Sequence, residues 1–222
     1  MRCHVAFTPD EVFEAPVAVV VDVLRATSTI VQALASGYRR VYCCREVGDA
    51  IALRERLGEG LLGGERNAVR IEGFDLGASP REVLEPRGET LIYSTTNGTR
   101  AVLAAAGCGE VLLGSLLNLE AVAGAVRQDC VIVCAGFQGR FALDDAYCAG
   151  RIVELLGDEV TDAAKASVVL AGAFPTAWEG LTARTYGPPG LEEDIKFCAQ
   201  ENVVDVVPRL SRMVDSAAEI TL

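Results

Sequence analysis

Histidine and lysine are almost missing from this chain of 222 residues, and aromatic residues are scarce. His4 is the only histidine, which argues against a Ser-His-Asp triad and against a histidine-rich zinc site. Lys165 and Lys196 are the only lysines among 20 basic residues, so nearly every cationic side chain is an arginine. Because aromatic residues make up only 6% of the chain, the core must consist mainly of aliphatic residues and alanine.

The chain also lacks any CxxC pair, although it contains eight cysteines. A zinc ribbon is therefore not expected. Most of the cysteines lie inside apolar strand or helix patterns, where reduced, buried thiols are common. These are Cys43, Cys44, Cys130, Cys134 and Cys148.

No apolar run is long enough to span a membrane, and the longest candidate, 163–174, contains Lys165. No secretory signal is visible at the N-terminus. The net charge of −11 disfavours binding to nucleic acid or to an anionic membrane. We therefore expect a cytoplasmic protein with no nucleic-acid or membrane partner. Half of the residues are hydrophobic, which predicts one domain over residues 1–222 or two closely packed lobes.

Apolar segments of strand length alternate with segments of helical pattern along the chain. The segment VAVVVDV at 17–23 is nearly all apolar, as expected for a strand that is buried on both faces. Further strands are expected at 41–44, 61–63, 90–94, 110–113, 130–134 and 203–207, with a last helix opening at Pro208. The alternation predicts a three-layer α/β/α fold with a largely parallel or mixed sheet.

A weak repeat occurs at an offset of 70 residues and is consistent with duplication of a βαβα unit or with chance. Thr29, Ala35, Gly37 and Val41 recur as Thr99, Ala105, Gly107 and Val111. Ligands of such α/β folds bind beyond the carboxyl ends of the strands. The polar loops that follow the predicted strands are therefore the candidate sites.

The first such loop, DVLRATST, carries Asp22 at the end of a buried strand and Arg25 three residues later. A buried strand seldom tolerates an unpaired charge, so Asp22 needs a partner. Either Asp22 pairs with Arg25 while a hydroxyl caps the next helix, or Asp22 binds a cation and Arg25 an anion.

Carboxylates gather in two further loops. The segment from Gly63 to Pro80 carries Glu65 and Asp75 among glycines, and FALDD places Asp144 and Asp145 just before a helix. Hard oxygen ligands on such segments suit Mg²⁺. The alternatives are an acidic surface loop for the first segment and helix caps for the second.

The loop STTNGTR, at 94–100, lies between a strand and a helix. Free backbone N–H groups at a helix N-terminus attract anions, Gly98 allows close approach, and Arg100 adds a charged fork. The alternative is a turn that is capped by Thr96 or Asn97.

The segment CAGFQGR has the spacing of a cysteine-dependent phosphatase loop, with Cys134 as nucleophile and Arg140 as phosphate ligand. In a chain with eight cysteines and 18 arginines, chance matches to this spacing are frequent enough that the match carries little weight by itself. A core cysteine at a strand end is the simpler interpretation.

Taken together and in order, these motifs resemble those of the 2-phosphosulfolactate phosphatase family, the ComB-like proteins. DVLRATST, GGER, EGFDLGASP, STTNGTRA, CAG..GR and LDDA carry the resemblance from about residue 17 to residue 150. One departure is Ala78, where the family is expected to have asparagine. The resemblance implies an α/β fold, a homo-oligomer such as a dimer, and Mg²⁺-dependent hydrolysis of 2-phosphosulfolactate to sulfolactate and phosphate in coenzyme M biosynthesis.

Loop position and charge suggest residue roles for such a reaction. Five carboxylates are candidate metal ligands: Asp22, Glu65, Asp75, Asp144 and Asp145. Candidate ligands of the substrate's anionic groups are Arg25, Arg66, Arg100 and Arg140, with Thr96, Asn97, Gly98 and Thr99. Asp22, Arg25 and Arg100 are the catalytic candidates. The rival hypotheses are a Cys134- and Arg140-dependent phosphatase and a non-catalytic protein that binds anions or nucleotides.

Overall fold

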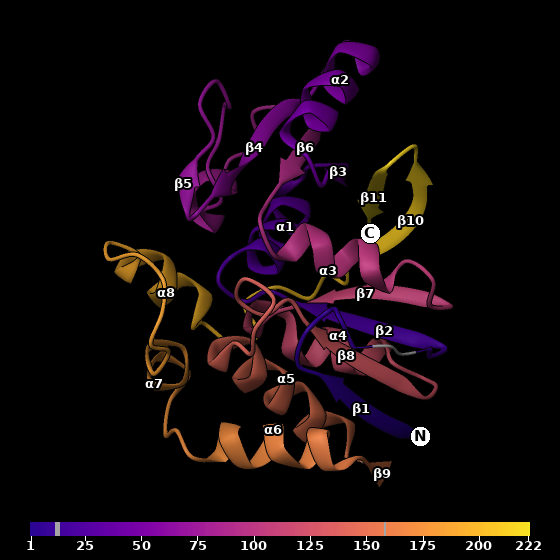
Figure 1. The fold of residues 1–222 in the computed structure, drawn as a ribbon, viewed down its shortest axis with the longest axis vertical. Helices are drawn as coiled ribbons and strands as arrows, with labels where there is room; N and C mark the ends of the chain where they lie inside the picture. The colour runs from indigo at the N-terminus through magenta and orange to yellow at the C-terminus, as the bar shows by residue number, and fades with distance from the viewer. Residues whose placement is uncertain (12–13, 158) are drawn as a thin grey trace.

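The computed structural model describes residues 1–11, 14–157 and 159–222, which form a mixed sheet of 11 strands with helices packed around it (Figure 1). The strands are β1 Arg2–Ala6, β2 Val17–Val21, β3 Arg40–Cys43, β4 Leu61–Arg66, β5 Val69–Arg70, β6 Thr90–Ser94, β7 Glu110–Gly114, β8 Cys130–Cys134, β9 Glu159–Val160, β10 Arg209–Val214 and β11 Ala217–Thr221. The α-helices are α1 Ala26–Ser36, α2 Val47–Leu57, α3 Gly98–Ala105, α4 Leu119–Ala125, α5 Leu143–Leu156, α6 Asp162–Gly172, α7 Ala177–Thr182 and α8 Glu192–Cys198. The predicted α/β class is confirmed.

The sheet consists of two parallel blocks joined by an antiparallel hairpin. Its order is β5-β4-β6-β3-β11-β10-β7-β2-β8-β1-β9. Strands β4, β6 and β3 are parallel to one another, as are β7, β2, β8, β1 and β9. Hairpin β10–β11 pairs antiparallel with β3 on one side and with β7 on the other. In Figure 1 the strands of the first block stand steeply to those of the second.

The two segments that share the weak repeat have the same order of elements. The first is β2-α1-β3-α2 and the second is β6-α3-β7-α4. Strand β2 of the first segment pairs with β7 of the second, and β6 of the second segment pairs with β3 of the first. Each parallel block therefore contains a strand from each segment, and the loops after β2 and β6 belong to different blocks of the sheet.

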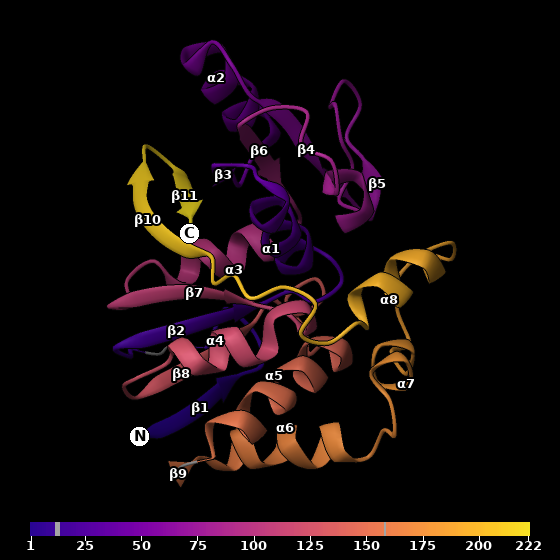
Figure 2. The same ribbon diagram turned by 180° about the vertical axis from the view of Figure 1, so that it is seen from behind.

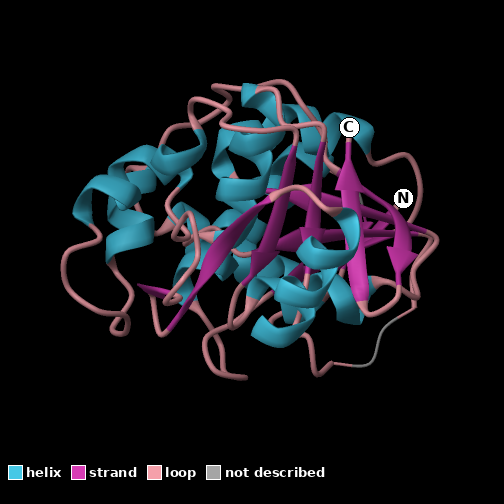
Figure 3. Ribbon diagram, turned by 90° about the horizontal axis from the view of Figure 1, so that it is seen from above, coloured by secondary structure: helices cyan, strands magenta, loops and turns pink. Residues whose placement is uncertain are grey.

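Alternating residues of the buried strands face two different layers of helices. Val19 of β2 packs with Leu119 of α4 and Ile152 of α5, whereas Val20 packs with Ile30 of α1 and with α3. Figure 3 shows helices on both sides of the strands. An unbroken apolar strand is therefore the expected pattern, because both of its faces are covered.

The C-terminal segment differs from the sequence prediction. Residues 203–207 form no strand and Pro208 opens no helix; instead Arg209–Val214 and Ala217–Thr221 form the central hairpin. Asp215 adopts a left-handed conformation in its turn. The chain reaches this hairpin by crossing the molecule after α8 (Figure 2). Strand β1 and helix α7 were also not predicted. Within the described ranges, no helix is long and apolar enough to cross a membrane.

Candidate active site

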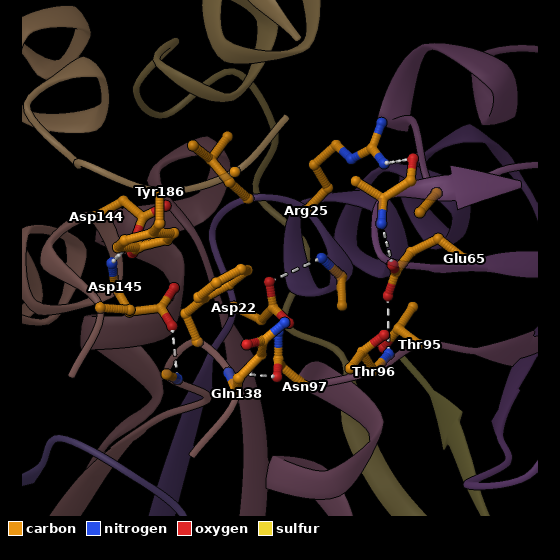
Figure 4. A pocket seen from close by; sticks show the side chains of 18 of the residues that line it. Asp22, Arg25, Glu65, Thr95, Thr96, Asn97, Gln138, Asp144, Asp145 and Tyr186 are labelled. Carbon is orange, nitrogen blue, oxygen red and sulfur yellow. Dashed lines mark hydrogen bonds between the residues drawn. The ribbon is translucent and has the colours of Figure 1, made fainter. Parts of the chain in front are cut away.

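A cavity of about 300 Å³ lies where the carboxyl ends of four strands meet (Figure 4). Asp22 follows β2, Glu65 lies near the end of β4, Thr95–Asn97 follow β6, and Gly136–Gln138 follow β8. The first turn of α5 and five residues between Arg184 and Leu191 also line the cavity. Seven of the residues predicted from sequence line this cavity: Asp22, Arg25, Glu65, Thr96, Asn97, Asp144 and Asp145.

Asp22 is buried at the centre of the site. Its Oδ1 accepts a hydrogen bond from the amide of Ala26 at 3.2 Å. Burial raises the pKa of Asp22 from its ordinary 3.8 to about 7; the Ala26 amide opposes this rise, and the nearby charges of Glu65 and Asp144 add to it. The site therefore crowds negative charge around a carboxylate that is removed from water.

Asp145 joins the ends of two neighbouring strands. Its Oδ1 accepts from the amide of Val23 at 2.9 Å, and its Oδ2 accepts from the amide of Gly136 at 3.0 Å. Both carboxylate oxygens are thus held by backbone donors from the loops after β2 and β8. Burial raises the pKa of Asp145 well above its ordinary range, and the charge of Asp144 adds to the effect.

Asp144 directly precedes Asp145 in the first turn of α5. The amide of Asp145 donates to Oδ1 of Asp144 at 3.1 Å, and the hydroxyl of Tyr186 donates to the same oxygen. Burial raises the pKa of Asp144, while the Tyr186 hydrogen bond and the charge of Arg184 oppose that rise. Tyr186, from the connection between α7 and α8, therefore helps to fix the side chain of Asp144.

Glu65 joins two loops in the same manner as Asp145. Its Oε1 accepts from the amide of Thr96 at 2.8 Å, and its Oε2 accepts from the amide of Ala68 at 2.6 Å. Neither Asn97 nor Thr96 caps α3 through its side chain; Oδ1 of Asn97 instead accepts from the amide of Gln138 at 3.1 Å. The amide of Thr96, expected to bind an anion, is already occupied by a carboxylate.

Arg25 lines the cavity but does not pair with Asp22. Its Nη1 donates to Oδ2 of Asp194 at 2.6 Å, and its Nη2 donates to the carbonyl of Ala68 at 3.1 Å. Burial lowers the pKa of Arg25, but the hydrogen bond to Asp194 and the charges of Tyr93, Asp194 and Glu65 together outweigh burial, so the net pKa is raised. The expected pair within DVLRATST is therefore replaced by a pair 169 residues apart.

Gly98 and Thr99 lie next to the lining residues. A Cβ on Gly98 would come within 2.6 Å of Oδ2 of Asp22 and 2.3 Å of Cβ of Ala26, so only glycine fits here. Oγ1 of Thr99 accepts from the amide of Thr95, and Oγ1 of Thr95 accepts from the amide of Thr99, both at 3.2 Å. This pair of threonines closes the turn that the sequence assigned to Thr96 or Asn97.

Two of the predicted site residues, Asp75 and Arg66, form contacts within the fold instead of lining the cavity. Oδ2 of Asp75 accepts from the amide of Leu62 at 2.8 Å and lies 3.7 Å from Arg54. The guanidinium of Arg66 donates to backbone carbonyls, including those of Ser94 and Arg45. Neither residue lines the cavity, so we remove Asp75 from the metal-ligand candidates and Arg66 from the anion ligands.

Two further arginines also lie outside the lining. Arg100 pairs with Asp10 at the surface, and Arg140 is exposed in a turn whose backbone pairs with Phe137. The predicted convergence of four arginines is therefore wrong: of those four, only Arg25 lines the cavity.

Comparison with known proteins assigns the family. A sequence model of 2-phosphosulpholactate phosphatase matches residues 5–213. The chain belongs to this family. It is 43% identical over 208 residues, 86% of each chain, to the probable 2-phosphosulfolactate phosphatase of Caldanaerobacter subterraneus. It is 37% identical to that of Carboxydothermus hydrogenoformans, over 94% of this chain and 92% of the relative, and 38% identical to that of Thermus thermophilus, over 98% of each.

As a 2-phosphosulfolactate phosphatase family member, the protein is a phosphoric monoester hydrolase. The hypothesis of a non-catalytic binding protein is thereby overturned. The structure also argues against the cysteine-dependent mechanism, because burial and the charge of Asp145 raise the pKa of Cys134 well above its ordinary range. A nucleophilic cysteine needs the opposite shift. Cys134 is fully buried and does not line the cavity.

The phosphatase cavity also contains residues that sequence reasoning did not identify. Arg184, Tyr186, Pro188 and Leu191 come from the connection between α7 and α8. The ring of Tyr186 stacks on Phe137 with centroids 4.5 Å apart. The only local signal was the run of glycine and proline at 187–190, which marks a loop but no ligand.

The charged side chains that line the cavity are relevant to metal binding. Four carboxylates line the cavity, namely Asp22, Glu65, Asp144 and Asp145, against two arginines, Arg25 and Arg184. In the described part of the chain no group of three or more His, Cys, Asp or Glu side chains is arranged to hold a metal. Mg²⁺ needs only one or two protein carboxylates, since water and substrate phosphate supply the rest. The donor set fits that requirement.

Proposed function

We propose that this cavity is the active site of a Mg²⁺-dependent phosphatase acting on 2-phosphosulfolactate or a related phosphorylated 2-hydroxy acid. The observation that carries the proposal is the crowding of buried carboxylates around Asp22, whose pKa rises to about 7. An anionic phosphate ester cannot approach four carboxylates unless a cation compensates their charge. A divalent cation would satisfy both the protein and the substrate.

Asp22 and Asp144 are the residues that would hold the ion. Hydrogen bonds to these two side chains from other described residues all end on Oδ1, whereas both oxygens of Glu65 and Asp145 accept backbone amides. Bound Mg²⁺ supplies charge compensation for the phosphoryl group. Glu65 and Asp145 instead hold the loops that shape the cavity.

Arg25 would bind an anionic group of the substrate. A guanidinium has five N–H groups, and the hydrogen bonds of Arg25 to Asp194 and Ala68 leave donors available along the cavity wall. Arg184 supplies a second positive charge in the lining. Phosphoryl transfer depends mainly on such positioning and charge stabilisation. Burial of Arg25 favours this role, because a desolvated guanidinium interacts strongly with an anion.

The test measures phosphate release from 2-phosphosulfolactate, phospholactate and phosphoglycolate with Mg²⁺, after EDTA treatment, and after Mg²⁺ is restored. We expect activity to disappear in EDTA and to return with the metal. Asp22→Asn should abolish turnover, whereas Asp75→Asn, which changes a carboxylate outside the cavity, should retain it. Full activity in EDTA would overturn the metal requirement. The substrate with the highest kcat/KM identifies the acid, and failure of all three refutes the proposed substrate class.

A homodimer, a cytoplasmic location and a place in coenzyme M biosynthesis stay predictions. The mass of the protein in solution, measured by light scattering after size-exclusion chromatography, tests the first.

A further inference from the structure

Asp194 is a buried carboxylate that the sequence did not single out. It lies in α8, has 7% of its surface exposed, and does not line the cavity. Its Oδ2 accepts from Nη1 of Arg25 at 2.6 Å, and its Oδ1 accepts from the hydroxyl of Ser79 at 2.6 Å. Both distances are short, as expected for hydrogen bonds to a charged carboxylate.

The guanidinium of Arg25 has two hydrogen-bond acceptors, and they differ in strength. One is the carboxylate of Asp194, with both side chains 9% exposed. The other is the carbonyl of Ala68, which lies in a turn where Asn67 and Ala68 both have left-handed backbone conformations. The hydrogen bond to Asp194 is the stronger of the two, because it joins a guanidinium to a carboxylate in a buried site, whereas the carbonyl of Ala68 is a neutral acceptor.

The cavity itself contains competing partners for this guanidinium. Asp22 and Glu65 are close enough that their charges interact with Arg25. Without a carboxylate behind it, the flexible arginine side chain would be drawn toward those two residues. Such a pairing would use up the arginine charge that the substrate needs, and would neutralise the carboxylates that the cation needs.

We propose that Asp194 is a positioning residue, which holds the guanidinium of Arg25 at the cavity wall and away from Asp22 and Glu65. The inference rests on the proposed function of the cavity, in which Arg25 binds an anionic group of the substrate. Asp194 does not line the cavity, so it would act on the substrate through Arg25; its other partners are Ser79 and Arg81, whose Nη1 lies 3.9 Å from Oδ1 and which also do not line the cavity.

Asp194→Asn removes the charge and keeps the size of the side chain. The matched control is Glu193→Gln, which removes a carboxylate one residue earlier on the same helix, where Glu193 is exposed and paired with Lys196. The measurements are kcat and KM for the best phosphorylated acid, the Kd of inorganic phosphate by isothermal titration calorimetry in Mg²⁺, and the thermal unfolding midpoint. Each is repeated with Arg25→Gln in the same chain.

We expect Asp194→Asn to lower kcat/KM by about 10- to 100-fold, since a small misplacement of a binding group has effects of that size. Phosphate affinity should fall in parallel, while Glu193→Gln should stay within about twofold of the wild type. In the Arg25→Gln background, Asp194→Asn should change phosphate affinity by no more than about twofold, because the residue through which it acts is gone.

An equal loss of phosphate affinity in both backgrounds, or no loss in either, would overturn the positioning role. If Asp194→Asn does not fold, Ser79→Ala provides the test. It removes one hydrogen bond of Asp194 and should cause a smaller loss that also disappears with Arg25→Gln. A wild-type protein that binds phosphate but hydrolyses none of the acids refutes the proposed substrate, and the phosphate titrations still decide the role of Asp194.

Discussion

Replacing Asp22 by asparagine is expected to abolish activity and, in the absence of metal, to stabilise the protein. Asparagine has the same shape, and its amide oxygen can still accept from the Ala26 amide that now meets Oδ1 at 3.2 Å. The substitution therefore removes the charge with little change in packing. What it relieves is the cost of ionising a buried carboxyl group beside other carboxylates.

The size of the effect follows from the pKa. The rise in the pKa of Asp22 from 3.8 to about 7 corresponds to about 4 kcal/mol of unfavourable free energy when the group is ionised. Because the folded-state pKa is the higher one, the contribution of Asp22 to stability is fully present below pH 3.8 and is lost as the pH rises through about 7. The asparagine side chain does not titrate, so the variant should be more stable by up to about 4 kcal/mol at pH 8, and by almost nothing near pH 4.

Urea unfolding of both proteins in EDTA at pH 4, 6 and 8 measures this difference directly. Saturating Mg²⁺ should then stabilise the wild type, by about 2.7 kcal/mol at 100 times its Kd, and should stabilise Asp22→Asn much less. A variant that is less stable than the wild type at pH 8 in EDTA would refute the reasoning. So would a stability difference that does not depend on pH between 4 and 8.

Four further substitutions test other parts of the site. Gly98→Ala should lower kcat/KM at least tenfold, because the new Cβ would displace the carboxylate of Asp22. Gly124→Ala is the control: a Cβ at that position has nothing within 4 Å and should leave kcat/KM unchanged. Equal values for the two variants would contradict the prediction. Tyr186→Phe removes the hydroxyl that donates a hydrogen bond to Asp144, and it should weaken Mg²⁺ binding several-fold in a metal titration. Cys134→Ala should retain kcat/KM within about threefold, and a loss like that of a missing nucleophile would revive the thiol mechanism. Arg100→Gln should change KM less than tenfold, since this side chain pairs with an exposed carboxylate outside the cavity.

Sequence reasoning identified the strand-end loops of the site because that part depends on local pattern. A buried apolar strand such as Val17–Val21 has a recognisable end, and Asp22 directly follows it. The same logic located Glu65, Asn97 and Asp145 at other strand or helix ends. Convergence of such ends is a general property of α/β sheets, so it could be expected before any contact was known.

Side-chain direction could not be read in the same way. Arg66 lies next to Glu65, yet its guanidinium turns to backbone carbonyls while Glu65 lines the cavity. Arg100 does not line the cavity and meets Asp10, which is 90 residues away in sequence. Neighbouring charged residues in one loop thus have opposite roles, and composition does not distinguish them.

Contacts between distant segments were also out of reach. Tyr186 meets Asp144 across 42 residues, and Asp194 meets Arg25 across 169. Both partners come from the connection that leads into α8 or from α8 itself, where no strand end marks a site and the resemblance to the family is less distinctive. Their positions depend on how the helices pack, which no short spacing in the sequence encodes.

The carboxylates of the cavity divide into two pairs according to their oxygens. Glu65 and Asp145 each accept a backbone amide on both oxygens, and each ties together loops from two different strands. Loss of Asp145 would leave two buried amide donors unpaired, which costs about 1–3 kcal/mol per group, whereas loss of Glu65 would free the less buried amides of Thr96 and Ala68. Asp22 and Asp144 have their amide and hydroxyl donors on one oxygen only. Substitutions at the first pair should therefore destabilise the protein, whereas substitutions at the second pair should weaken metal binding without such a loss of stability, although all four side chains lie in one cavity.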